Sequence, residues 1–169
     1  MTRLFIWMVI FIFPFLTVNC QEVHQTSVTK SEDNKTLSFV KEDGILKVNI
    51  DKNRSCLLAD DAIAYETYVS PKATWIAVET QLLSNIQIIR LYKKNSDGCY
   101  KPLKSPLSVK LWHTLAVKKG FSIDDVSHPR MQFLKWIDNE QILIALSGEI
   151  GNKAIDVNVS YDLRVFHID

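Results

Sequence analysis

A strict alternation of side-chain character near the C-terminus constrains the fold most strongly. From residue 155 to residue 165 every second residue is apolar, and the residues between them are polar or charged. Successive side chains of a β-strand point to opposite faces, so this period of two predicts a strand with one buried and one solvated face. The rest of the chain must therefore supply a sheet and a layer that covers its buried face.

Shorter segments with turn residues between them extend this β pattern. Asp43-Gly44 stands between two strand-like segments, 37–40 and 45–50, and Asp-Gly in that position is a strong hairpin signal. The predicted fold class is mainly β, with antiparallel twisted hairpins in an open propeller-like or sandwich arrangement. Further strands are expected at 62–69, 75–80, 86–92, 131–137 and 142–146, with turns at 70–73, 95–98 and 138–140.

One segment departs from the β pattern. Ser105-Pro106 has the residues of a helix start, leucines recur at helical spacing from Leu107, and Gly120 follows two lysines as a stop signal. The sequence therefore predicts one α-helix over 106–119, packed against a sheet.

The N-terminus has the organisation of a secretory signal. Arg3 makes the first residues basic, and 4–18 is an apolar run that is too short for a permanent membrane span, which needs about 20 residues. We expect a signal peptide over 1–20, a flexible tether over 21–36 and a single β-rich domain over 37–169. The protein is thus expected to be periplasmic or secreted.

Cys20 leaves two routes of processing open. Lipoprotein signals place a leucine three residues before the lipidated cysteine, whereas here Leu16 stands one place too early, so ordinary cleavage after Cys20 is favoured. Lipidation of Cys20 is the alternative, and only that form is expected at the membrane. Cleavage would leave 19 basic and 19 acidic side chains, a balance that does not attract nucleic acid.

Two cysteines remain after the signal, Cys56 and Cys99. In an oxidising compartment an even pair is best interpreted as a disulfide, and neither cysteine has a second ligand at metal-binding spacing. We expect a Cys56–Cys99 bond that contributes on the order of 4 kcal/mol by closing a long loop.

Two segments resemble blades of exported β-propeller proteins. The first is Tyr68-Val69-Ser70-Pro71-Lys72-Ala73-Thr74-Trp75-Ile76-Ala77-Val78 with the following 86–92, and the second is 133–144. The resemblance implies twisted antiparallel hairpins and carries no function with it. A fainter resemblance links the chain to periplasmic lysozyme inhibitors and toxin-immunity proteins. Ser147-Gly148-Glu149-Ile150-Gly151 resembles the Ser-Gly loop of the lysozyme inhibitors, in which a serine on a protruding hairpin enters the cleft of the enzyme.

The sequence carries no catalytic motif such as Gly-x-Ser-x-Gly or His-Glu-x-x-His, so we predict a protein that is not an enzyme and needs no cofactor or metal. Asp124 and His128, spaced i,i+4, are interpreted as surface residues, since Pro129 favours an extended backbone at His128. The pair Asp60-Asp61 is interpreted as a solvated turn, with half of a cation site as the alternative. The tryptophans that could stack on a ligand are expected in the core: Trp75, Trp112 and Trp136.

Two segments are better candidates for contact with a partner. One carries a leucine pair where a hairpin connection is normally polar, and the other offers small and polar residues able to enter a groove. The predicted partner-binding residues are Gln81, Leu82, Leu83, Ser84 and Asn85 in the first segment, and Ser147, Gly148, Glu149 and Asn152 in the second, within the expected loop 147–153.

These features together favour an exported binding protein. We expect a periplasmic immunity protein or inhibitor that inserts a loop into the active-site cleft of a secreted cell-wall hydrolase or toxin. The alternative is a periplasmic ligand-binding or envelope-assembly protein, lipid-anchored if Cys20 is modified.

Overall fold

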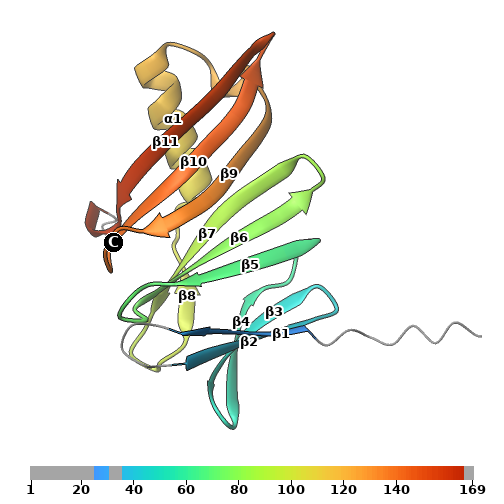
Figure 1. Cartoon of the computed structure of the whole chain (residues 1–169), viewed down its shortest axis with the longest axis vertical. Coiled ribbons are helices and arrows are strands. Elements are labelled where there is room, and N and C mark those ends of the chain that lie inside the picture. The colour runs from blue at the N-terminus through green and yellow to red at the C-terminus, as the bar shows by residue number, and fades with distance from the viewer. Residues whose placement is uncertain (1–24, 31–35, 166–169) are drawn as a thin grey trace, which may run out of the picture.

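A computed structural model describes residues 25–30 and 36–165 of the chain. Within those ranges the protein is mainly β, with two sheets, no closed barrel and one α-helix, so the predicted fold class is confirmed. Figure 1 shows three layers: β1–β4 lie on one side of β5–β7, and β9–β11 with the helix lie on the other.

The first sheet is a meander of four antiparallel strands in chain order. The predicted hairpin at Asp43-Gly44 is present, and both residues have positive φ (49° and 77°), as its tight turn requires. The flexible tether expected over 21–36 is wrong for 25–30, because these residues form a strand that pairs with the next strand, 36–42. The strands are β1 (Gln25–Lys30), β2 (Thr36–Glu42), β3 (Ile45–Asp51) and β4 (Arg54–Ala59).

The second sheet has the order β11-β10-β9-β7-β6-β5, and β8 pairs with the end of β7. Its strands are antiparallel neighbours except at β7 and β9, which are joined in parallel by the Gln87–Arg130 bridge. The sheet therefore divides into two hairpin groups that meet at that bridge. The strands are β5 (Ala64–Val69), β6 (Trp75–Leu83), β7 (Ile86–Lys94), β8 (Tyr100–Pro102), β9 (Val126–Trp136), β10 (Gln141–Ile150) and β11 (Lys153–Asp162).

The last strand ends three residues before the alternating pattern that predicted it. β11 ends at Asp162, and Leu163–Val165 forms a 3-10 turn, η2, in which Leu163 is buried. The N–H group of Leu163 donates to the backbone oxygen of Glu140 at 2.7 Å. The chain therefore turns inward to bury Leu163 where the alternation alone predicts that the strand continues.

Strand β6 holds the layers together. Its first six residues are all buried, and the first four of them alternate between two hydrophobic cores. Trp75 and Ala77 belong to the core shared with the helix, and Ile76 and Val78 belong to the core shared with the first sheet. A strand that is buried on both faces has no solvated side, so the start of β6 is a continuous apolar run.

The helix α1 (Leu107–Lys119) confirms the prediction for 106–119. It covers the first core through Leu111, Trp112 and Leu115, and it ends at Gly120, where φ is 73°. Trp75 and Trp112 are in the core as expected, and Trp136 packs against it half-buried. Within the described ranges, no helix has both the length and the apolar character needed to cross a membrane.

The predicted disulfide is present and joins the first sheet to the middle layer. Cys56 lies in β4, and Cys99 directly precedes β8. The same two layers are also joined by hydrogen bonds, since Tyr65 Oη donates to the backbone oxygen of Gly44 at 2.8 Å. The covalent bond therefore closes a contact that packing and hydrogen bonds already define.

The two segments that resemble propeller blades touch each other at their turns. Asn139, in the turn between β9 and β10, accepts hydrogen bonds from the hydroxyl of Ser70 and the N–H of Lys72, both at 3.0 Å. The Ser70 hydroxyl, which is fully buried, also accepts from the N–H of Trp75. Ser70 thus fixes both the entry to β6 and the position of the β9–β10 turn.

Glu79 is a buried carboxyl group at the junction of β6 and β9. It is 8% exposed, and it accepts hydrogen bonds from the Phe133 N–H at 2.7 Å and from the side-chain amide of Gln87. Burial is the main cause that raises its pKa above the ordinary 4.5, and the bond from Phe133 opposes the rise. This carboxyl group therefore accepts the hydrogen bond of a buried N–H group on β9, and burial in return disfavours its ionised form.

The disulfide gives a first prediction. Replacing both cysteines, Cys56→Ala with Cys99→Ala, should lower the free energy of unfolding by about 2–4 kcal/mol, because the unfolded chain gains the freedom that the closed loop removed. Urea unfolding of the oxidised protein and of the double variant measures the difference. An unchanged unfolding midpoint in the variant would contradict a stabilising Cys56–Cys99 bond.

Glu79 gives a second prediction. Because its folded pKa is raised, the native state holds this proton more tightly than the unfolded chain, so its contribution to stability is greatest below the unfolded pKa and is lost as pH rises through the folded pKa. In Glu79→Gln, which keeps an acceptor for Phe133, this loss should be absent. Urea unfolding of both proteins between about pH 4 and pH 8 tests this, and a wild-type minus variant difference that does not change with pH would refute it.

Candidate functional site

The first predicted contact segment forms the tip of the β6–β7 hairpin. Gln81, Leu82 and Leu83 are the last residues of β6, and Ser84-Asn85 form the connection to β7. The side chain of Leu83 is 53% exposed, and Leu82 is half-buried. In Figure 1 this tip, where β6 joins β7, lies at the edge of the molecule. An exposed leucine is therefore present where the sequence placed a contact site.

The second predicted contact segment is not a protruding loop. Ser147, Gly148 and Glu149 lie within β10, whose partners are β9 on one side and β11 on the other. Only Gly151 and Asn152 remain in the turn. The loop expected at 147–153 is wrong because pairing on both sides continues the ladder almost to the end of the hairpin.

A β-bulge interrupts the pairing of β9 with β10 next to that segment. The register shifts between Ser147 and Glu149, and on the opposite strand His128 has a φ of 51°. Positive φ is unusual for a residue with a side chain, and it costs on the order of 1–2 kcal/mol. The extended backbone predicted for His128 is therefore wrong, and the strand carries a strained residue there. Such strain is found preferentially at functional sites.

Gly148 allows the close packing beneath the bulge. A Cβ atom at this position would lie 2.9 Å from Cγ1 of Val126 and 3.3 Å from the backbone oxygen of Ser127. A side chain there would have to displace backbone as well as side-chain atoms. The glycine is thus explained by packing, independently of any partner.

Arg130 connects the two predicted segments into one surface. In the sheet Arg130 lies opposite Ser147 of β10 and opposite Gln87 of β7. Its guanidinium donates a hydrogen bond to the backbone oxygen of Ser84 at 3.4 Å. We use the name bulge surface for Leu83, Ser84, His128, Arg130 and Ser147. The tertiary structure places on one edge residues that lie up to 64 positions apart in the sequence.

The bulge surface combines an exposed apolar group with polar groups. Leu83, His128 and Arg130 are exposed, and Ser147 is half-buried. Among the described residues, Arg130 forms no ion pair, so its charge is available to solvent. An apolar recess of about 210 Å³ adjoins this edge, and its lining includes Ile86, Ile88, Val109, Trp112, Val126 and Pro129. Such a surface can make both apolar and charged contacts with another protein.

Two acidic segments singled out in the sequence for their chemistry, Asp60-Asp61 and the Asp124/His128 pair, lie in different surroundings. Asp61 forms a two-pronged ion pair with Arg90, and this contact is the main cause that lowers the pKa of Asp61. The alternative of a cation site at Asp60-Asp61 is therefore wrong, because both carboxylate oxygens of Asp61 accept hydrogen bonds from Arg90. Asp124 lies in the 3-10 turn η1 (Ile123–Asp125) and is exposed, as is His128.

In the part of the chain that the structure describes, His, Cys, Asp and Glu side chains do not gather in any group of three that could hold a metal ion. Cys20 and the predicted signal peptide lie outside the described residues. A scan against protein-family models, a search of curated proteins and a search of solved structures each found no match.

Sequence reasoning missed His128 and Arg130 as parts of this surface. Pro129 excluded regular pairing just before the expected strand 131–137, because proline cannot donate to a sheet, and the structure extends that strand back to Val126. Nothing near Arg130 in the sequence indicates that it contacts Ser84, since 46 residues separate them.

The strained backbone gives a third prediction. His128→Gly should raise the free energy of unfolding by about 0.5–1 kcal/mol, because glycine adopts positive φ without steric cost. The control Gln132→Gly, at an exposed position of β9 without positive φ, should lower it by a similar amount. Urea unfolding compares the three proteins, and a loss of stability in His128→Gly equal to that in the control would show that no strain is released.

Proposed function

We propose that the protein is an exported binding protein, a periplasmic immunity protein or inhibitor that blocks a cell-wall-degrading enzyme. The observation that carries this proposal is the Arg130 contact, which joins the β6–β7 tip and the Ser147 segment into the bulge surface. The inserted element is the β6–β7 tip, and the Ser147 segment supports it from the neighbouring strand.

Rigidity supports an inhibitory role for this tip. The β6–β7 hairpin is paired from Trp75 and Lys93 to Leu83 and Ile86, with one register shift between Gln81 and Leu83, and its other end is buried in both cores. A contact element that is already ordered loses little conformational entropy on binding, so more of the interaction energy appears as affinity. Leu83 can act as an apolar anchor, and Arg130 can pair with a carboxylate of the partner.

A carboxylate is a reasonable target for Arg130 because enzymes that cleave glycosidic bonds ordinarily use a pair of Asp or Glu residues. A guanidinium placed beside such a cleft would pair with one of them and hold it out of the reaction. This reasoning favours a hydrolase of the cell wall over a toxin of another class.

A second candidate function is binding of a small molecule in the envelope. It is favoured by a cleft of about 340 Å³ on a different part of the molecule, which lies within the size range of ligand pockets.

The fourth prediction tests the inhibitor proposal with a matched pair of variants. Leu83 and Leu57 are similarly exposed, at 53% and 56%, but Leu57 lies on β4, outside the bulge surface. Leu83→Glu should weaken inhibition of the target enzyme roughly 100-fold, the size expected when a central anchor is lost, and Leu57→Glu should change it less than about 3-fold.

The measurement uses a panel of purified peptidoglycan muramidases and amidases, with inhibition of cell-wall hydrolysis and complex formation by size-exclusion chromatography as readouts. Inhibition that both variants reduce equally would remove the β6–β7 tip from the interface. Absence of both complex and inhibition across the panel would overturn the proposed function.

A further inference from the structure

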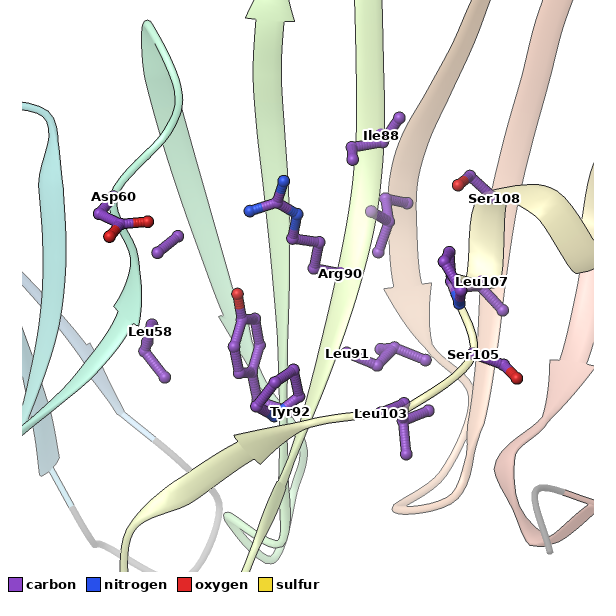
Figure 2. Close-up of a pocket in the computed structure, with 14 residues that line it drawn as sticks. Leu58, Asp60, Ile88, Arg90, Leu91, Tyr92, Leu103, Ser105, Leu107 and Ser108 are labelled. Atoms are coloured by element: carbon purple, nitrogen blue, oxygen red, sulfur yellow. The ribbon is translucent and has the colours of Figure 1, made fainter. Parts of the chain in front are cut away.

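A cleft opens between three segments that are distant in the sequence. Figure 2 shows it between the end of β4, strand β7 and the segment that leads from β8 into α1. Its volume is about 340 Å³, which suits a small ligand. The lining residues that matter here are Leu58, Asp60, Arg90, Tyr92, Leu103 and Leu107.

Apolar side chains form two opposite walls of the cleft. Leu58 projects from the β4 side, and Leu103 and Leu107 project from the segment that enters α1, as Figure 2 shows. Leu107 belongs to the first core and Leu58 to the second, so both walls are anchored in packed structure. An apolar chain that binds between them would be transferred out of water, and neither wall would have to move.

A fixed polar group lies between these walls. The Arg90 guanidinium donates to both carboxylate oxygens of Asp61, each at 2.6 Å, so its orientation is set before any ligand arrives. A guanidinium has more N–H groups than this pair uses, so Arg90 can still donate to an acceptor in the cleft. Its side chain is 29% exposed and therefore remains accessible.

Asp60 determines which acceptor fits. Its carboxylate is exposed and lines the same cleft, and in the described part of the chain it forms no ion pair. Asp61 already balances the charge of Arg90, so Asp60 leaves this end of the cleft with a net negative charge. A ligand carboxylate would be repelled by Asp60, and a ligand ammonium would meet the remaining N–H groups of Arg90.

A neutral amide satisfies both groups, because its carbonyl accepts from Arg90 and its N–H donates to Asp60. We propose that this cleft is a binding site for a short apolar chain that ends in a neutral amide, such as an acyl amide. The site is separate from the bulge surface, so it does not depend on the proposed inhibitor function, and a neutral amide of this kind is the ligand class for the second candidate function.

The fifth prediction uses octanamide as the probe, with octanoate and octylammonium as its charged counterparts. Titration of the ¹⁵N-labelled protein with octanamide should shift the amide resonances of 88–92, 103–105 and 107–108. The shifts should saturate with a dissociation constant on the order of 1 mM, which roughly ten non-hydrogen atoms can reach. Octanoate and octylammonium should bind at least about 10-fold more weakly.

Two isosteric variants separate the site from nonspecific binding. In Asp60→Asn the repulsion is gone, so octanoate should bind within about 3-fold of octanamide. The control Asp124→Asn, at an exposed aspartate outside the cleft, should keep the preference of the unchanged protein. Shifts that fail to saturate or fall outside the cleft, equal binding of the three probes, or an Asp60→Asn protein that still rejects octanoate would each overturn the proposal. None of these outcomes bears on the inhibition assay.

Discussion

Burial of β6 on both faces is the constraint on which the rest of the structure depends. Trp75 and Ala77 complete the core under α1, and Ile76 and Val78 complete the core of the first sheet. Each outer layer packs its apolar face against this middle strand, so both cores include residues of β6. The disulfide and the bonds of Ser70 and Tyr65 reinforce contacts that the double burial of β6 already requires.

The same arrangement positions both candidate binding regions. β6 and β7 continue past the cores, so their connection carries Leu83 into solvent on a rigid support. β7 meets β9 at the Gln87–Arg130 bridge, and beyond this bridge the two strands diverge. The bulge at His128 lies on one side of that junction, and the cleft at Arg90 lies between the middle layer and the segment entering α1. The bulge surface therefore adjoins the junction of β7 with β9, whereas the cleft is lined by the end of β4, by β7 and by the segment entering α1.

Local patterns indicated part of the candidate site. A leucine pair in a hairpin connection correctly placed an exposed apolar residue at Leu83, because polar residues normally occupy such turns. The segment at Ser147 looked like a loop, since its glycine and polar residues are typical of turns, but strands on both sides of β10 hold it in a sheet. Gly148 is small because Val126 and Ser127 approach it closely, and that approach involves a strand about 20 residues away in the sequence.

The sequence by itself determined the strands other than β1, β4 and β8, together with the hairpin at Asp43-Gly44, the helix that ends at Gly120 and the pairing of Cys56 with Cys99. Each of these follows from local periodicity, turn geometry or the number of cysteines. Only the tertiary structure decided that β7 lies beside β9, that Arg130 reaches Ser84 and that Asp61 holds Arg90. Backbone hydrogen bonds are chemically the same for every pair of strands, so they do not specify which strands become neighbours. That choice depends on how the apolar faces fill two cores at once, which no local stretch of residues encodes.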